Sequence, residues 1–388
     1  MTEFPAGRFR MVIVGQSPTP YYTAIQNAVA DAVDLTVIFF GDGSKPSGTL
    51  WAAFEDPWSG PTRFRTIWHR AATISSTRAD FRFRASLGVA SRLAVLRPDV
   101  LVLHSWEPVM LEPLIWATLT RCPLVLWSES ASRSGLVRSR ASNLYRSLFV
   151  RRADALVSTG SAASAYLRDL GAHRSDVLEQ ALPSPLGSLI AGEPVGDAAA
   201  ACRFLFVGRL VERKRPLAAV RAFRRLADTD PRVTLHVVGD GPLLNRAITE
   251  AGAHRDRVRF SGRLEGNALV RAYVDADVLV LPADREVWGL VVNEALAAGL
   301  YVIASDRVGS AADLLGDGLG DQFSVDDEDE LVRAMGRALG EDASASAREF
   351  RRRRVAGVTP ESFAAVLARA ASRAMQRRRP GQSLRNGT

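Results

Sequence analysis

Cysteine is scarce in this chain of 388 residues, since Cys122 and Cys202 are the only two. One lies in each half of the sequence, so the pattern predicts neither a disulfide framework nor a cysteine metal site. A reducing, cytoplasmic environment fits this usage. His, Asp and Glu do not cluster at metal-ligand spacing either. Asp275-Ala-Asp277 precedes a predicted strand instead of ending one, so we interpret it as structural and expect no metal.

Long hydrophobic runs are also lacking. No stretch approaches the ~20 apolar residues that a membrane-spanning helix needs. The apolar part of residues 1–15 is too short for a signal-peptide core and predicts a first strand instead. Hydrophobic residues still make up 47% of the chain and charged residues 24%, which is enough to bury sizeable cores. A globular protein of about two domains is expected from this length.

Acidic residues are the minority among charged ones, with 42 Asp and Glu against 50 Lys and Arg and a formal charge of +8. Lys45 and Lys214 are the only lysines, so arginine carries the excess. This balance favours anionic partners such as nucleotides, nucleic acid or an acidic membrane face, although a GC-rich genome would also produce it. Residues 141–152 predict a basic amphipathic helix that either rests on an anionic membrane or packs on its own domain. Basic runs at 351–354 and 377–379 favour the membrane.

Apolar runs in the first half alternate with helical patterns, which predicts a parallel, doubly wound sheet. The run at 98–104 ends at His104 and is followed by Glu107, and the run at 122–127 is followed by Glu129. Ligands in such sheets bind at the carboxyl ends of strands, so these three residues are candidates for the acceptor side of a cleft. The alternative is that His104 is a buried hydrogen-bonding residue.

Residues 41–65 interrupt this alternation with many Gly, Pro and Ser residues and with the aromatic residues Trp51, Phe54, Trp58 and Phe64. Long loops inside a domain are usually functional. Two interpretations remain open, a pocket for an acceptor and a cover over the edge of the sheet.

A second α/β half follows a boundary. Residues 183–197 are polar and rich in proline and glycine, which is typical of a linker. The strand pattern then restarts with apolar runs at 203–207, 233–238, 258–260, 278–281 and 301–304. We therefore expect one Rossmann-like domain over residues 1–185, a second over 200–360, and a tail at 379–388.

The stretch from Glu286 to Gly299 reads as a loop and a helix after a buried strand. Helix starts offer unpaired amides and the positive end of the helix dipole, which suits a diphosphate. Glu286 precedes that start, and Glu294 lies one to two turns inside the helix. Carboxylates only accept hydrogen bonds, so sugar hydroxyls are suitable partners for this pair. The alternative is two ordinary acids near a helix dipole.

A second phosphate-binding element is predicted where the first strand of this half ends. Gly208 lets the backbone approach a ligand closely, Arg209 offers a forked donor and Lys214 a mobile charge. The turns after the next two strands, at 239–242 and 261–264, can reach a nucleobase with backbone groups.

These motifs occur together, and in this order the set resembles the nucleotide-binding half of the family 4 glycosyltransferases (glycosyl transferases group 1). The match runs over about residues 203–340. It consists of Gly208-Arg209-Leu210 with Lys214, Val238-Gly-Asp-Gly-Pro242, Phe260-Ser-Gly262, Ala276-Asp-Val-Leu-Val-Leu-Pro282, and Glu286-x7-Glu294 followed by Ala295, Gly299 and Ser305-Asp306. The first half departs from the family, with one glycine in Gly15-Gln-Ser-Pro-Thr-Pro20 and with Ser128-Glu129 near where many members place a histidine.

The resemblance implies a GT-B fold, in which two Rossmann-like domains face each other across a cleft and a C-terminal helix, here about 361–378, crosses back to the first domain. It implies that Arg209 and Lys214 bind the diphosphate and stabilise it as it leaves. Glu286 would hold hydroxyls of the donor sugar and Glu294 the ribose. Further donor contacts would come from Gly208, the amides of Trp288, Gly289, Leu290 and Val291, and the base-binding loop around Gly262 and Arg263.

The resulting hypothesis is a retaining, metal-independent glycosyltransferase of polysaccharide biosynthesis. It would move a hexosyl unit from a nucleoside diphosphate sugar to a lipid-linked or cell-surface glycan, in the cytoplasm and in peripheral contact with the inner membrane face. A soluble natural-product acceptor, and a phosphorylase or epimerase of the same architecture, remain alternatives. A nucleic-acid-binding protein is disfavoured, because the arginines are dispersed and no recognised module appears.

Overall fold

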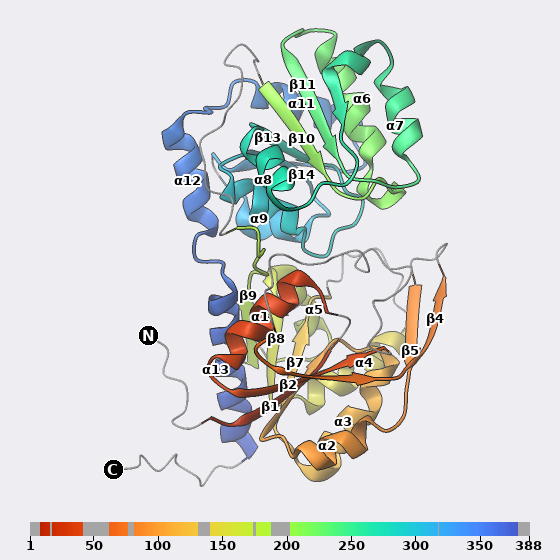
Figure 1. The fold of residues 1–388 in the computed structure, drawn as a ribbon, viewed down its shortest axis with the longest axis vertical. Coiled ribbons are helices and arrows are strands. Elements are labelled where there is room, and N and C mark those ends of the chain that lie inside the picture. The colour runs from red at the N-terminus through yellow and green to blue at the C-terminus, as the bar shows by residue number, and fades with distance from the viewer. Residues whose placement is uncertain are drawn as a thin grey trace. The chain divides into compact units, whose positions relative to one another are not determined.

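The structure is a computed structural model that describes residues 8–15, 18–41, 62–76, 81–130, 140–173, 176–187, 202–316 and 318–378 (Figure 1). These residues form two compact units. The first contains the described residues up to 180 together with 360–378, and the second contains residues 181–359. The aromatic residues Trp51, Phe54 and Trp58 and the expected tail at 379–388 lie outside the described residues, whereas Phe64 is buried.

A seven-stranded parallel sheet forms the centre of the first unit, with the order β3-β2-β1-β6-β7-β8-β9. The strands β6 and β7 are buried over their whole length, as expected where helices cover both faces of a parallel sheet. The order reverses at β1 and β6, the kind of position where such sheets bind ligands. The strands are β1 (Arg10–Gly15), β2 (Asp34–Phe40), β3 (Arg65–His69), β6 (Val100–His104), β7 (Leu124–Ser128), β8 (Ala155–Thr159) and β9 (Val177–Gln180).

Helices of the first unit come from both ends of the sequence. The last helix, α13, packs against α1 and the central strands (Figure 1). Its Phe363 is fully buried, with its ring 4.9 Å from that of Trp127. The expected return of the C-terminal helix to the first domain is therefore confirmed. The helices are α1 (Pro20–Ala30), α2 (Val89–Leu96), α3 (Leu111–Thr120), α4 (Arg140–Arg152), α5 (Gly160–Asp169) and α13 (Pro360–Arg378), with a short helix η1 (Pro108–Met110) and the antiparallel pair β4 (Ala72–Ser76) and β5 (Phe81–Ala85).

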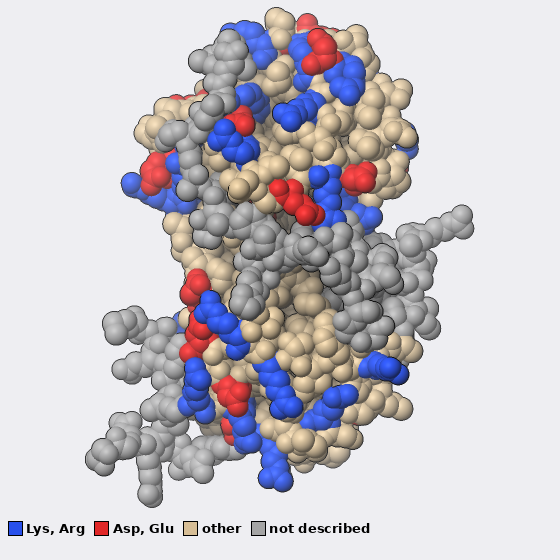
Figure 2. All heavy atoms as spheres, in the orientation of Figure 1, with Lys and Arg blue, Asp and Glu red and all other residues tan. Residues whose placement is uncertain are grey.

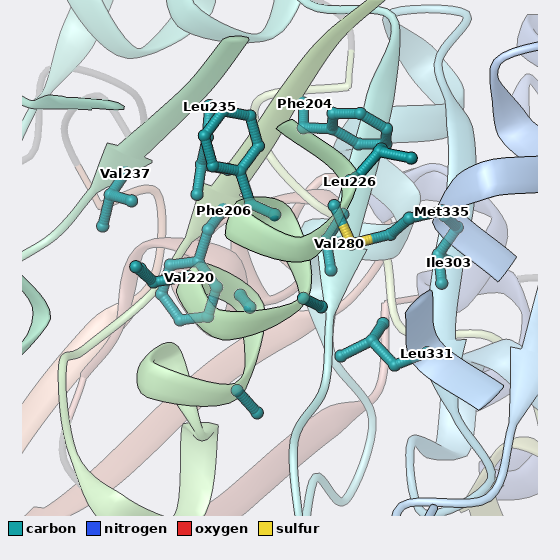
Figure 3. Close-up of a cluster of buried hydrophobic side chains, with 14 of the residues drawn as sticks. Phe204, Phe206, Val220, Leu226, Leu235, Val237, Val280, Ile303, Leu331 and Met335 are labelled. Atoms are coloured by element: carbon teal, nitrogen blue, oxygen red, sulfur yellow. The ribbon is translucent and has the colours of Figure 1, made fainter. Parts of the chain in front are cut away.

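A six-stranded parallel sheet in the order β12-β11-β10-β13-β14-β15 forms the second unit. Its core includes Phe204 and Phe206 of β10, Val220 of α6 and Leu331 of α11 (Figure 3). The strands are β10 (Cys202–Val207), β11 (Val233–Val238), β12 (Val258–Phe260), β13 (Val278–Leu281), β14 (Tyr301–Ser305) and β15 (Gly320–Phe323). The helices are η3 (Glu212–Lys214), α6 (Pro216–Ala227), α7 (Leu244–Ala251), η4 (Gly252–Arg257), α8 (Gly266–Val274), α9 (Leu290–Ala297), α10 (Gly309–Leu314), α11 (Glu328–Ala338) and α12 (Ala345–Val355). Both sheets match the doubly wound architecture expected from the sequence.

The two basic runs near the C-terminus mostly make internal contacts. Arg351 is 3% exposed and donates to the carbonyl of Gly318, and Arg354 donates to that of Leu314. Arg377 pairs with Asp176 at 2.5 Å, and Arg378 pairs with Asp154 at 2.7 Å. These four side chains therefore have partners within the protein, and the interpretation of the two runs as favouring a membrane face stays a prediction.

The acid-x-acid pattern has a structural role at Asp277. Its carboxylate accepts hydrogen bonds from Arg203 Nε at 2.9 Å and Nη2 at 2.8 Å, and from Arg348 Nη2 at 2.7 Å. Arg348 is 3% exposed. Asp277 thereby joins the starts of β10 and β13 to α12, as the interpretation from sequence expected.

Glycines let the loops after β10 and β11 pack directly on each other. A Cβ atom on Gly239 would lie 1.8 Å from the carbonyl oxygen of Gly208, and one on Gly241 would lie 2.6 Å from that of Leu210. The amide of Gly208 donates to Val238 at 3.0 Å, which extends the strand pairing into these loops. Side chains at these two glycines would separate the loops, so the close backbone approach fixes one edge of the sheet.

Candidate functional site

The helix α9 begins at the carboxyl edge of the second sheet. Gly289 precedes it with a φ of 96°, in the left-handed region that glycine adopts at little cost. Ser310 holds this turn, because its hydroxyl donates to the carbonyl of Gly289 at 3.1 Å and its amide donates to that of Trp288 at 2.8 Å. The amides of Trp288, Gly289, Leu290 and Val291 have no hydrogen-bond partner among the described residues. This helix start is therefore open to an anion.

Lys214 lies beside the loop that leads into α9. The residue is 8% exposed, and its ammonium forms an ion pair with Glu286. Arg213, which the sequence did not single out, lies 3.2 Å from the same Glu286 oxygen. The amide of Asp284 donates to the carbonyl of Arg213 at 2.8 Å, so the two loops are joined through their backbones as well. Because an ammonium has three donors, Lys214 is able to bind a phosphate while it keeps Glu286.

Gly208 and Arg209 lie in the adjacent loop. A Cβ atom on Gly208 would approach the aliphatic stem of Lys214 to 3.9 Å. Arg209 is exposed, and its guanidinium has no partner among the residues that the structure describes. Its five donors are thus available to a ligand, while those of Lys214 are partly used by Glu286.

Glu294 is buried, and both carboxylate oxygens accept a hydrogen bond. Ser184 donates to Oε1 at 2.8 Å, and Tyr273 of α8 donates to Oε2. Burial raises the pKa of Glu294, and the bonds from Tyr273 and Ser184 and the charge of Lys214 oppose that rise. Asn293, next in the helix, donates to the carbonyl of Leu182 at 3.2 Å. The carboxylate of Glu294, which we predicted to bind the ribose, is therefore held in one orientation. The bonds to Ser184 and Leu182 also connect α9 to residues 182–184.

The expected base-binding loop follows β12. Gly262 has a φ of 63°, and a Cβ atom there would meet nothing within 4 Å. Its carbonyl accepts from the amide of Gly239 at 2.7 Å, which keeps the ends of β11 and β12 together. Arg263 pairs with Glu265 at 2.6 Å. The structure thus groups every predicted donor residue at one edge of the second sheet.

In the first unit the structure brings His104 and Glu129 together. The imidazole Nε2 of His104 lies 3.4 Å from Glu129 Oε1, and its ring stacks on Trp127 at 3.9 Å and 8° from parallel. Tyr22 of α1, which the sequence did not single out, donates to the same Glu129 oxygen at 2.7 Å. Burial and the charge of Glu129 raise the pKa of Tyr22 well above its ordinary value, so the phenol stays protonated. His104 is 2% exposed, in agreement with the buried hydrogen-bonding alternative.

Ser105 follows directly at the end of β6 with a φ of 102°. Non-glycine residues in this region cost about 1–3 kcal/mol and cluster at functional sites. Its hydroxyl is buried without a partner among the described residues. Glu107 directly precedes the short helix η1, and its carbonyl accepts from the amide of Met110 at 2.8 Å and from the hydroxyl of Tyr145 at 3.3 Å. Ser105, which the sequence analysis did not single out, is thus a further candidate for the acceptor side at the end of β6.

Comparison with known proteins agrees with the family resemblance that the sequence motifs of the second half indicated. Residues 201–354 match the sequence model of the family described as glycosyl transferases group 1. The chain is 29% identical over 264 residues to glycogen synthase of Mycobacterium tuberculosis, which covers 65% of this chain and 63% of that protein. It is 32% identical over 224 residues to D-inositol 3-phosphate glycosyltransferase of Streptomyces griseus, which covers 49% of this chain and 47% of that protein. The chain thus spans less than two thirds of the length of these relatives.

Solved structures show the same fold over nearly the whole chain. A glycosyltransferase from Rickettsia africae matches with a TM-score of 0.70 at 12% identity, over 97% of this chain and 100% of that one. HepE from Anabaena, solved in complex with UDP, matches with a TM-score of 0.67 at 16% identity, over 94% of this chain and 99% of that one. The GT-B fold expected from the sequence is confirmed. Residues 201–354 therefore resemble the glycosyl transferases group 1 family in sequence, and the whole chain shares its fold with known glycosyltransferases.

Proposed function

We propose that the protein is a retaining, metal-independent glycosyltransferase that moves a hexosyl unit from a nucleoside diphosphate sugar to an acceptor hydroxyl. The bond between the anomeric carbon and the phosphate oxygen breaks, and the acceptor oxygen forms the new bond on the same face. The acceptor proton passes to the departing phosphate oxygen. The extra negative charge then falls where Arg209, Lys214 and the amides at the start of α9 are placed.

The observation that carries this proposal is the grouping of cations, open amides and acids at one edge of the second sheet. Lys214 and Arg213 share Glu286, two to three residues before the amides of Trp288 and Gly289. A diphosphate placed on those amides would meet the ammonium, leaving Glu286 to accept bonds from the sugar. Support also comes from HepE, which was solved in complex with UDP and, in a second structure, with UDP-glucose.

The donor is identified by a thermal-stability screen of nucleotides and nucleotide sugars. A ligand at 100 times its Kd adds about 2.7 kcal/mol to the free energy of unfolding, so a true donor raises the Tm clearly. We expect one nucleoside diphosphate and its sugar conjugate to stand out, with little response to nucleoside alone. A chain that responds to no nucleoside diphosphate, yet binds oligonucleotides tightly, contradicts the proposal and favours the nucleic-acid alternative.

Tyr273→Phe is expected to weaken binding of that nucleotide about three- to tenfold, because Glu294 loses one of the donors that fix it. The effect should largely disappear when the ribose is replaced by deoxyribose, since the lost orientation matters for the sugar hydroxyls. Isothermal titration with the ribo- and deoxynucleotide measures both. Equal weakening for the two ligands would mean that Tyr273 acts only on the stability of the unit.

The lipid-linked acceptor is supported by an exposed apolar surface on the first unit. Leu111, Ile115 and Leu119 repeat along α3 with 38%, 50% and 80% exposure, and Leu144 and Leu148 lie on α4 with 69% and 49%. Arg152 ties the two helices, since it donates to the carbonyl of Ala117 and the hydroxyl of Thr118. Among the residues that the structure describes nearby in the sequence, Arg121, Arg140 and Arg151 are exposed. Apolar and basic residues together suit an anionic membrane face.

Charge elsewhere on the molecule is mixed. On the visible face in Figure 2, basic side chains are scattered over both units with acidic ones among them. None of the described helices is both long enough and apolar enough to pass through a bilayer. The proposed contact is therefore peripheral and made by the helices α3 and α4.

Ile115→Glu and Leu148→Glu should each lower sedimentation with anionic vesicles severalfold, and high salt should weaken the binding of the wild-type chain. Both side chains are about half exposed, so the substitutions leave the core intact. Phe350→Glu, at a residue of the second unit with 55% exposure, is the matched control. If neither variant differs from that control, the acceptor is better sought among soluble natural products.

A further inference from the structure

A cavity of about 300 Å³ lies in the first unit, away from the candidate residues already described. It is lined by Gly41, Trp68, His69, Arg70, Leu87 and Arg92. Gly41 follows β2, and Arg70 follows β3, so the cavity opens at the carboxyl edge of the seven-stranded sheet. Such edges are where open α/β sheets bind ligands. The volume is at the small end of known ligand sites, enough for about one phosphorylated sugar.

The hydrogen bonds of His69 settle its protonation. Arg92 Nε only donates, so His69 Nδ1 accepts this bond at 3.0 Å, and Nε2 carries the proton that it donates to the carbonyl of Leu87 at 3.1 Å. Burial and the charge of Arg92 lower the pKa of His69. The neutral imidazole therefore fixes the guanidinium of Arg92 through Nε, and the two terminal nitrogens of that guanidinium remain available.

The charge of this cavity is positive. Arg70 is exposed and has no partner among the described residues, and none of the six lining residues is acidic. Glu112 is the acid close by, and its oxygens accept from the amides of Gly88, Val89 and Ala90 at 2.9 to 3.1 Å. That carboxylate therefore caps α2 and compensates the helix start, which leaves Arg70 and Arg92 for an anion.

An aromatic wall completes the cavity. The indole of Trp68 is partly exposed and lies 5.5 Å from the ring of Phe39. A Cβ atom on Gly41 would come within 3.4 Å of that indole, and the amide of Gly41 donates to the carbonyl of His69 at 2.9 Å. A glycine here keeps the face of the indole open. Such a face packs well against the C–H side of a sugar ring, while arginines pair with phosphate through two parallel hydrogen bonds.

We propose that this cavity binds a phosphate group carried on a sugar or polyol, and that it recognises the acceptor. The inference rests on the proposed glycosyl transfer, which it deepens by giving the acceptor an anionic group next to a carbohydrate ring. Arg70 and Arg92 bind the phosphate, His69 positions Arg92, and Trp68 contacts the ring. The phosphate belongs either to a free sugar phosphate or to a lipid that carries the sugar.

The test is isothermal titration of the full chain with glucose 6-phosphate, inorganic phosphate and glucose, in saturating UDP so that the second unit is occupied. Arg70→Ala and Arg92→Ala are each expected to weaken glucose 6-phosphate binding about tenfold or more, because each removes a charge-assisted hydrogen bond. Arg168→Ala, an exposed arginine near the end of α5, is the matched control and should bind like wild type. UDP affinity should be the same in all four chains.

Vesicles containing phosphatidic acid separate the two sources of the phosphate. If a lipid carries it, glucose 6-phosphate does not bind, and Arg70→Ala and Arg92→Ala reduce vesicle binding relative to Arg168→Ala. The proposal is overturned if glucose binds as well as its phosphate, or if neither substitution changes binding of either probe. Failure of the proposed donor chemistry appears separately, as a lack of response to every nucleoside diphosphate in the thermal screen, because the arginine dependence is then measured without a nucleotide.

Discussion

Lys214→Ala is expected to lower kcat about 10²- to 10³-fold with the donor found by the thermal screen, the range seen when one preorganised stabilising donor is removed from an active site. Lys214 is 8% exposed and is held by Glu286, so its charge is fixed before a ligand arrives. It is also the only lysine of the second unit. No neighbouring ammonium can replace it.

Initial rates over a range of donor concentrations provide the measurement. Arg246→Ala is the matched control, because Arg246 is an exposed cation that pairs with Glu212 of the same loop at 3.4 Å. It should leave both kcat and KM unchanged. Lys214→Arg keeps the charge and should recover part of the rate. Unchanged kcat and KM in Lys214→Ala would remove the diphosphate role.

Asp277→Asn is expected to lower the free energy of unfolding of the second unit by about 3–5 kcal/mol, the usual result of removing one partner from a buried ion pair. Arg348 is 3% exposed and would lose its counterion, and Arg203 would lose a two-pronged partner. The midpoint of urea unfolding, followed by a probe in the second unit, reports the change. Asp329→Asn at an exposed pair with Arg225 is the control and should shift the midpoint little.

The contacts of Asp277 with Arg203 and Arg348 also predict that the stability of the second unit depends on pH. Burial alone would raise the pKa of Asp277, but the hydrogen bonds and charge of Arg203 and the charge of Arg348 bring it below the ordinary value. A carboxylate with a lowered folded pKa stabilises the fold fully above its unfolded pKa of about 4 and loses that contribution as pH falls through the folded pKa. Wild type should therefore lose stability below about pH 4 more steeply than Asp277→Asn. Parallel curves would show that another group controls acid unfolding.

Strand-end residues were predicted well because their position depends on local pattern. Apolar runs mark parallel strands, and the residue that follows each run lies at the carboxyl edge of a sheet. Gly208, Gly262 and Glu286 were placed in this way, and the structure gathers them at one edge. The helix start at Gly289 followed from the same reading, since glycine and a run of helix formers come directly after the strand.

Partners across long sequence distances were not predictable from such patterns. Tyr273 and Ser184 both bond to Glu294, across 21 and 110 residues. Tyr22 reaches Glu129 across 107 residues. The basic runs at 351–354 and 377–379 were interpreted only by their charge, yet Arg351 donates to the carbonyl of Gly318 and Arg378 to the carboxylate of Asp154. Periodicity does not tell which carbonyl or carboxylate a long side chain finds.

The sequence by itself determined the α/β class, the two halves, the edge of each sheet where the candidate residues lie and the resemblance of the second half to a known family, because these depend on local periodicity and short motifs. Only the tertiary structure decided that Glu286 shares its carboxylate between Lys214 and Arg213, that Glu294 is held from two sides, and that His69 orients Arg92 in a separate cavity. These are contacts between side chains far apart in the chain. They exist because packing brings strand ends together, and burial then requires each polar group to find a partner.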